Sequence, residues 1–343
     1  MFRMTGRSLA VLLIQITLIT IATTTALAQA GGSYSNGQPR RKVIMSMVLD
    51  RSGSMVSDGG AAALQAAVPM FISLFNDSLD DVALVSFGNN AEINVPIGHN
   101  FITPIISSVE GLNFTGGTFG TAAGKRPILS PTIGAPMSLA DLQNNSIVIS
   151  PGQKITKVLV YFTDGLMNTV QDNFFCPNLV LLNYGGFDAQ QGMQYGDIFD
   201  PRSESVIFGT AGSQGFPYDG HGDLCRDSSG RYVTTFTSQQ DGSQKSFLQS
   251  NITAEAQYRA IYTANFMRSE NPVPTYIYMI GLGSTLTQTT QNFLAQLAND
   301  PRYPTYIPTQ PAGEFFYIPD CPSQTCTTEL NAAFQAIASQ LLH

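Results

Sequence analysis

Short apolar runs alternate along the chain with segments in which apolar residues recur every three or four positions. Runs of strand length occupy residues 43–49, 82–87, 155–162, 275–280 and 315–318. Nearly continuous apolar runs of this length are typical of parallel strands that are buried on both faces. Residues 91–95 follow the second run after a Gly-Asn-Asn turn and predict an antiparallel hairpin at the sheet edge.

Segments with the spacing of an amphipathic helix follow most of these runs. Leu64, Val68, Phe71 and Phe75 share one predicted helix stripe, which Pro69 is expected to kink. The same spacing recurs near the C-terminus, at Leu330, Phe334, Ile337 and Leu341. Further helices are predicted over residues 102–110, 253–268 and 288–298, and Glu255 and Arg259 lie one turn apart in the second of these.

Strands that alternate with helices predict an α/β fold, with a doubly wound, mostly parallel central sheet and helices on both faces. Two segments depart from this pattern. Residues 125–152 are rich in proline and read as an inserted loop, and residues 166–251 are far longer than an ordinary connection. We therefore expect one domain over residues 43–343 with two insertions, preceded by a linker at 31–42.

Charge and the N-terminus bear on compartment and partners. The 343 residues carry a formal charge of −7, which argues against nucleic acid as a partner. Arg3 and Arg7 precede an apolar stretch that ends in Ala28-Gln29-Ala30, as in an export signal over residues 1–30. A retained membrane anchor over 9–30 is the alternative, although several threonines dilute its hydrophobicity. Either way the chain is expected to be exported, to the periplasm, the cell surface or the medium.

The cysteines agree with export. There are four, without a CxxC pair, so two disulfides are a better interpretation than zinc. Three connectivities are possible in principle. We expect Cys176 to pair with Cys225 and Cys321 with Cys326, because each pair falls within one loop region.

Polar residues follow two of the predicted strands. In doubly wound sheets ligands bind beyond the carboxyl ends of the strands, which is where Asp50 and Asp164 would lie. Two carboxylates and three hydroxyls form an all-oxygen set that suits Mg²⁺, since Ca²⁺ usually takes more carboxylate oxygens. An incompletely filled octahedron leaves a position for a carboxylate from elsewhere. The candidate ligands are Asp50, Ser52, Ser54, Thr118 and Asp164.

At these residues the chain resembles the von Willebrand factor A-type (vWA) family with its metal-ion-dependent adhesion site. The matching segments are 50–54 (Asp-Arg-Ser-Gly-Ser), 116–118 (Gly-Gly-Thr), 162–165 (Phe-Thr-Asp-Gly) and 281–283 (Gly-Leu-Gly), within a resemblance that spans 43–342. The resemblance implies that the hydroxyls ligate the metal directly or nearly so and that both aspartates act directly or through water. It also implies that a partner's acidic side chain completes the shell.

Several alternatives stay open. Mn²⁺ or Ca²⁺ could replace Mg²⁺, and Thr121 could replace Thr118, because residues 119–125 follow the family pattern only loosely. Asp50, Ser52 and Ser54 could merely form a turn that caps the next helix. The segment 166–251 could select a partner, act as a lid or be a disulfide-stapled loop.

The expected function is a metal-dependent protein-binding module rather than an enzyme. The order of export segment, basic stretch and solitary domain resembles, more weakly, bacterial proteins associated with tight-adherence (Tad) pilus assembly. The alternative is a scaffold component of an envelope or pilus machine that binds without metal. A second cation site at Asp219, Asp223 and Asp227 fits no EF-hand spacing. The surroundings of Ser213 only faintly resemble those of a hydrolase nucleophile.

Overall fold

The computed structural model describes most of residues 41–343. It leaves out residues 1–40, 58, 89–90, 115–135, 166, 168, 173–184, 189–196, 201–204, 209–228, 230–234, 247, 285, 320, 322–323 and 343. The predicted export signal and most of the linker therefore lie outside the described residues. Of the helices that are described, none is long and apolar enough to cross a membrane.

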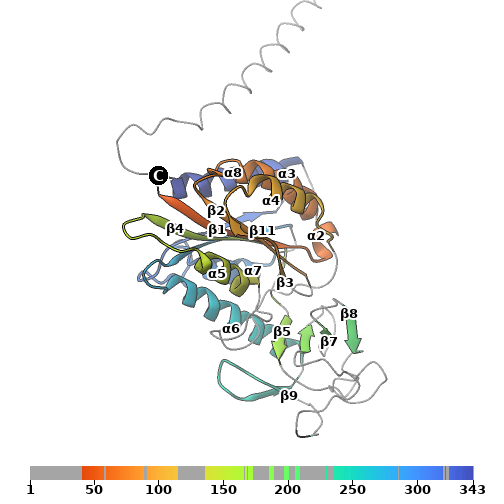
Figure 1. Ribbon diagram of the computed structural model, residues 1–343. Coiled ribbons are helices and arrows are strands. Elements are labelled where there is room, and N and C mark those ends of the chain that lie inside the picture. Colours follow the sequence, from red (N-terminus) through yellow and green to blue (C-terminus); the bar gives the residue numbers. More distant parts are fainter. Residues whose placement is uncertain are drawn as a thin grey trace, which may run out of the picture. The chain divides into compact units, whose positions relative to one another are not determined.

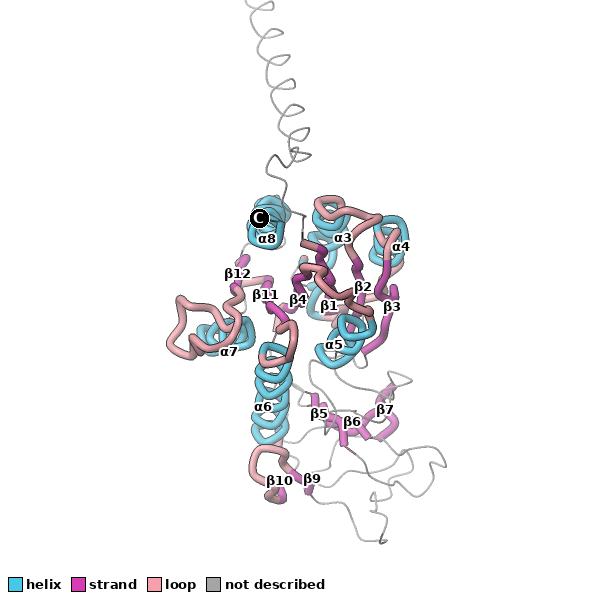
Figure 2. The backbone as a smooth tube through the Cα atoms, turned by 60° about the vertical axis from the view of Figure 1, so that its left-hand side comes forward, coloured by secondary structure: helices cyan, strands magenta, loops and turns pink. Residues whose placement is uncertain are grey.

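The centre of the domain is a six-stranded sheet with the order β12-β11-β4-β1-β2-β3 (Figures 1 and 2). Neighbouring strands are parallel except for β2 and β3, which form the predicted antiparallel hairpin at one edge. All the predicted strands are present. Their bounds are β1 Lys42–Asp50, β2 Asp81–Phe87, β3 Ala91–Gly98, β4 Ile155–Thr163, β11 Thr275–Leu282 and β12 Glu314–Ile318.

Helices cover both faces of this sheet (Figure 1). One face carries α3 (Gly60–Ile72), α4 (Ile102–Glu110) and α8 (Gln324–Leu342). The other carries α5 (Pro136–Ser146), α6 (Gln249–Arg268) and α7 (Gln288–Ala298). A single turn, α2 (Ser54–Ser57), follows β1. The predicted doubly wound α/β fold is thus confirmed.

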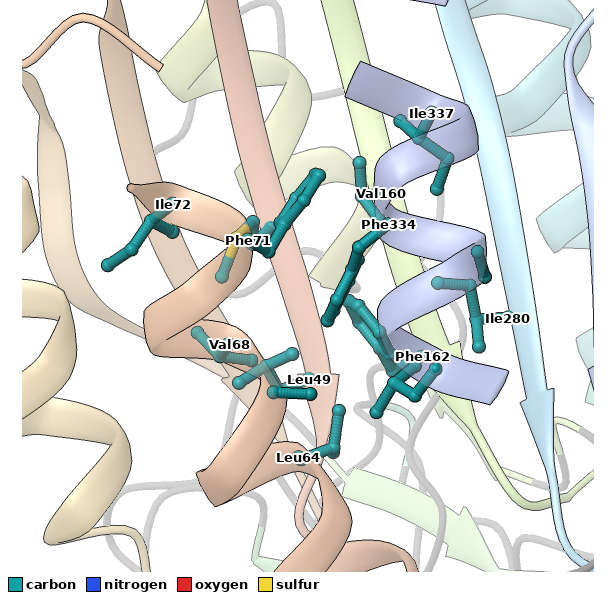
Figure 3. Close-up of a cluster of buried hydrophobic side chains, with 14 of the residues drawn as sticks. Leu49, Leu64, Val68, Phe71, Ile72, Val160, Phe162, Ile280, Phe334 and Ile337 are labelled. Atoms are coloured by element: carbon teal, nitrogen blue, oxygen red, sulfur yellow. The ribbon is translucent and has the colours of Figure 1, made fainter. Parts of the chain in front are cut away.

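The two predicted helix stripes meet over the sheet. Every residue of both stripes is buried, from Leu64 to Phe75 and from Leu330 to Leu341. Phe71 of α3 stacks on Phe334 of α8 with ring centroids 4.2 Å apart (Figure 3). Phe162 of β4 meets the same Phe334 ring edge-on at 5.4 Å. Burial of each such side chain contributes roughly 1.5–3 kcal/mol, so this layer holds the ends of β1 and β4 in place.

A helix stands where the sequence predicts part of an inserted loop. The interpretation of residues 125–152 as loop is wrong for 136–146, which form α5. The buried face of α5 is partly polar, because Asn144 accepts a hydrogen bond from Ser46 Oγ at 2.8 Å and donates one to the Val158 carbonyl at 2.9 Å. A helix face whose contacts with the sheet are partly polar leaves little hydrophobic periodicity in the sequence. The hydrophobic pattern therefore did not predict α5.

The long segment between β4 and α6 is structured in its own right where it is described. It forms an antiparallel sheet, order β5-β6-β7-β8, and a hairpin, β9–β10. The strands are β5 Thr169–Asp172, β6 Gly185–Asp188, β7 Asp197–Asp200, β8 Ser205–Phe208, β9 Thr235–Thr237 and β10 Gln244–Ser246. The candidate residues Ser213, Asp219, Asp223 and Asp227 lie outside the described residues, as do Cys176 and Cys225.

The predicted pair in α6 anchors the hairpin. Glu255 accepts hydrogen bonds from Arg259 Nε at 2.7 Å, Ser238 Oγ at 2.6 Å and the Gln239 amide at 2.7 Å. Both charged side chains are almost fully buried. The helix itself begins at Gln249, four residues before its predicted start at Thr253.

Two local features help to fix the C-terminal part of the domain. The predicted disulfide between Cys321 and Cys326 is present and lies at the start of α8. Gly281 approaches its neighbours so closely that an added Cβ would meet Leu286 at 2.7 Å. A side chain at that position would require the side chains of Leu286, Phe315 and Leu294 to shift, which favours glycine there.

Candidate metal centre

The candidate ligands from two loops meet at one edge of the sheet. Strands β1 and β4 are parallel neighbours, with Leu49 opposite Phe162, so the residues that follow each strand emerge side by side. The structure brings together Asp50, Ser52 and Ser54 from the first loop and Asp164 from the second. The predicted convergence of the two polar clusters is confirmed.

Three short polar contacts link the four residues. Ser52 Oγ and Ser54 Oγ are 3.0 Å apart, and Ser54 Oγ donates a hydrogen bond to Asp164 Oδ1 at 3.1 Å. Asp50 Oδ1 accepts a hydrogen bond from the Ser52 amide at 2.8 Å. Asp50 is fully buried and Asp164 is 5% exposed, whereas Ser54 is exposed. Ser52 is also buried, at 1% exposed, so Ser54 alone of these four residues lies at the surface.

The loop after β1 is held by its own backbone. The Arg51 amide donates to the Phe87 carbonyl at 2.7 Å, which ties the loop to the end of β2. The Met55 amide then donates to the Ser52 carbonyl at 3.2 Å and starts the α2 turn. The bond from the Ser52 amide to the Asp50 carboxylate is an Asx-type turn, so part of the turn-forming role considered for these residues is real. It coexists with the approach of the two serines to Asp164.

Thr163 belongs to the site, although the sequence did not single it out. Its Oγ1 donates a hydrogen bond to Asp50 Oδ2 at 2.7 Å and accepts one from the Gly165 amide at 3.2 Å. Thr163 lies within the matching segment 162–165, but β4 is buried on both faces, so its spacing gives no sign of the contact with Asp50. Thr163 fixes the orientation of the Asp50 carboxylate.

Burial sets the electrostatics. It raises the pKa of the Asp50 carboxyl from 3.8 to about 6, although hydrogen bonds from Ser52 and Thr163 act to lower it. Burial, with a contribution from the Asp50 charge, also raises the pKa of the neighbouring Tyr161 hydroxyl well above its usual value. A carboxylate that is costly to ionise where it lies is stabilised by a nearby cation.

The spacing of the oxygens fits Mg²⁺. Metal–oxygen bonds of about 2.0–2.1 Å in an octahedron place adjacent ligand oxygens about 2.8–3.0 Å apart. The two contacts through Ser54 measure 3.0 and 3.1 Å. The donor set is also of the hard, all-oxygen type that Mg²⁺ prefers. The residues present are therefore compatible with the ion, and the all-oxygen donor set is what favours it, since the same separations are ordinary for hydrogen-bonded hydroxyls.

The third predicted loop lies outside the described residues. Thr118 and its alternative Thr121 lie outside the described residues, and the described chain stops at Phe114 before them. Within the part of the chain that the structure describes, three or more His, Cys, Asp or Glu side chains do not cluster in a way that could hold a metal ion. A metal centre built from the described residues thus depends on hydroxyl ligands beside the two aspartates.

Comparison with known proteins gives structural likenesses only. No family model matches the chain, and neither does any curated protein. The pilus adhesin SpaC of Lactobacillus rhamnosus GG, in its open conformation, is similar with a TM-score of 0.48 and 13% identity, over 89% of this chain and 30% of SpaC. The minor pilin PilB of Streptococcus sanguinis gives 0.46 and 17%, over 90% and 63%.

A shorter protein is also similar over nearly its whole length. The vWF domain of the type V pili tip protein Mfa5 from Porphyromonas gingivalis gives a TM-score of 0.43 and 15% identity, over 89% of this chain and 96% of that domain. By contrast, this chain spans about a third of SpaC and less than two thirds of PilB. Likenesses at these identities concern the α/β fold and say nothing of ligands.

Proposed function

We propose that this chain is an exported binding module in which Mg²⁺ links the domain to a carboxylate of a partner protein, and that it is not an enzyme. The observation that carries the proposal is the meeting of two loops: the Ser52 amide binds Asp50, and side-chain oxygens join Ser52 to Ser54 and Ser54 to Asp164. The proposed ligand set is the predicted one: Asp50, Ser52, Ser54, Thr118 and Asp164. Surface adhesion or pilus assembly is the setting that the sequence resemblance implies.

Each described residue has a distinct part in this proposal. Both oxygens of Asp50 already accept hydrogen bonds, so Asp50 mainly supplies negative charge and holds the Ser52 loop. Ser54 presents its oxygen at hydrogen-bond distance from both Ser52 Oγ and Asp164 Oδ1. When bound, Mg²⁺ supplies a Lewis-acidic position that accepts a carboxylate oxygen. The two carboxylates just neutralise its charge, so a third carboxylate would be held by the open coordination position rather than by net charge.

The surface beside the site suits a protein partner. Val56, on the α2 turn that continues from Ser54, is 59% exposed. A partner that reached the metal would cover this valine and gain apolar contact there. Serine-based catalysis finds less support, because it needs a base near the hydroxyl. His99 lies at the far end of β3, next to Asp81 at the start of β2, and His221 and His343 lie outside the described residues.

Manganese provides a direct test, since Mn²⁺ takes the same oxygen ligands as Mg²⁺. The purified chain is titrated with Mn²⁺ while the signal of the free ion is followed by electron paramagnetic resonance, and then with acetate or acetamide. We expect one site, lost in Ser54→Ala and Asp164→Asn and kept in Glu110→Gln, which removes an exposed charge on α4. Acetate, and not acetamide, should lower the water-proton relaxation caused by the bound ion.

The possible results separate the two functions. Loss of relaxation with acetate shows a carboxylate replacing water on the ion and supports the binding module. Tight metal binding with no response to acetate would favour the scaffold alternative, in which the ion only holds the two loops together. A folded chain that binds no Mn²⁺ would exclude the proposal.

A further inference from the structure

A polar pocket borders the candidate metal centre. It has a volume of about 370 Å³ and lies between the start of β3 and the C-terminal end of α4. Arg51, which separates Asp50 from Ser52 in the sequence, forms part of its wall. The pocket therefore opens on the same edge of the sheet as the metal centre. Cavities of this size are at the small end of ligand sites and accommodate a single long side chain.

The feature that gives this pocket its chemistry is the Glu92 carboxylate. Its Oε1 accepts hydrogen bonds from Asn94 Nδ2 at 3.1 Å and Ser86 Oγ at 3.5 Å, and it lies 3.8 Å from Arg51 Nε. Both of these hydrogen bonds reach the same oxygen of the carboxylate. The Glu92 side chain is 50% exposed, whereas that of Arg51 is 7% exposed. The carboxylate is thus held by two hydrogen bonds at Oε1, with the Arg51 charge nearby, and its side chain is half exposed.

The opposite wall adds to this negative character. It contains Ser107 and Ser108, from the last turn of α4, and the residues that follow the helix. The C-terminal end of a helix carries a partial negative charge, and serine hydroxyls accept hydrogen bonds from a cation. The positive charge of Arg51 is set behind the surface and next to Glu92. A ligand that enters the pocket therefore meets acceptors first.

We propose that this pocket receives a basic side chain, lysine or arginine, of the same partner whose carboxylate reaches the metal. The inference rests on the proposed function and adds a specificity element to it. The recognised feature of the partner is then an acid with a base beside it. Such a pairing lets the domain discriminate among the many carboxylates of other proteins, because an acidic side chain without a neighbouring base gains nothing from Glu92.

Butylguanidinium serves as a one-side-chain probe. It is titrated into the full chain, in EDTA and separately in Mg²⁺, while backbone amide shifts of residues 107–113 are followed by nuclear magnetic resonance. We expect saturable shifts at these residues in both solutions, with affinity about three- to fivefold weaker in Glu92→Gln, the loss typical of one partly exposed charge pair. Glu110→Gln is the matched control, because it removes an exposed glutamate of α4 that does not line the pocket.

Other results would overturn the inference. Shifts that appear with propionate instead of butylguanidinium would make the pocket an anion site governed by Arg51. Equal weakening by Glu92→Gln and Glu110→Gln would reduce the effect to general surface charge. Failure of the proposed function would give a different result. Mg²⁺ titrated into the same samples would then leave the amide shifts of residues 50–56 unchanged, while butylguanidinium would still change those of residues 107–113. In that case the pocket would bind cations but the link to a metal-bound partner would be lost.

Discussion

Replacement of Asp50 by asparagine should remove a pH dependence from the stability of the metal-free chain. The side chains have the same shape, and Thr163 Oγ1, which now donates to Asp50, can accept from the asparagine amide instead. What the replacement removes is an ionisable group in a fully buried position. The difference between the two proteins as a function of pH therefore isolates the cost of ionising Asp50.

The size of the effect follows from the pKa. Burial raises the pKa of Asp50 from 3.8 to about 6, a shift of about two units that corresponds to roughly 3 kcal/mol. The folded state holds this proton more tightly than the unfolded state does, so the stabilising contribution is complete below pH 3.8 and is lost as pH rises through 6. Between pH 4 and pH 7 the wild-type chain should thus lose roughly 3 kcal/mol relative to Asp50→Asn.

Urea unfolding in EDTA, at closely spaced pH values, measures this difference directly. The free energy of unfolding of the wild type minus that of Asp50→Asn should fall with pH across that window and level off above it. Saturating Mg²⁺ should abolish the fall, because a cation favours the ionised carboxylate. A difference that stays flat from pH 4 to pH 8 in EDTA would show that Asp50 is not held in a costly position, and would refute the reasoning.

Three further substitutions test the fold. Glu255→Gln leaves the Arg259 charge buried without its carboxylate, so it should lower the free energy of unfolding by about 3–5 kcal/mol and release the β9–β10 hairpin to proteolysis. Phe334→Ala empties the layer between α3 and α8 and should cost about 3–5 kcal/mol in urea unfolding, whereas the 88% exposed Val148 should tolerate alanine without a measurable change. Asn144→Ala should cost about 1–3 kcal/mol, because the buried Val158 carbonyl loses its side-chain donor, whereas Ser46 Oγ keeps the Ala140 carbonyl as an acceptor. Faster amide hydrogen exchange confined to α5 would check its local origin.

The sequence predicted the central architecture because apolar runs and helix stripes correspond to burial on both sides of the sheet. The strands, the edge hairpin and the stripes of α3 and α8 all follow from that single relation. It failed at α5, whose contact with the sheet runs through Asn144 rather than through a hydrophobic stripe. It was silent on the sheet of β5–β8, whose strands are only four residues long, too short for alternation to stand out.

The candidate site shows the same division. Topology alone predicted that Asp50 and Asp164 would meet, because the carboxyl ends of neighbouring parallel strands share an edge. The part of Thr163 and the oriented Glu92 depended on side-chain contacts between strands, which no linear spacing reveals. The predicted ligand Thr118 stays a prediction, as do the export signal and the pairing of Cys176 with Cys225.

Isothermal titration of the purified chain with Mg²⁺ tests the central claim most directly. The comparison is with an Asp50→Ala, Ser52→Ala double variant and with Glu110→Gln as a charge-matched control. The account predicts one Mg²⁺ site in the wild type and in Glu110→Gln, and none in the folded double variant. Absence of Mg²⁺ binding by the folded wild type, or equal binding by the double variant, would contradict it.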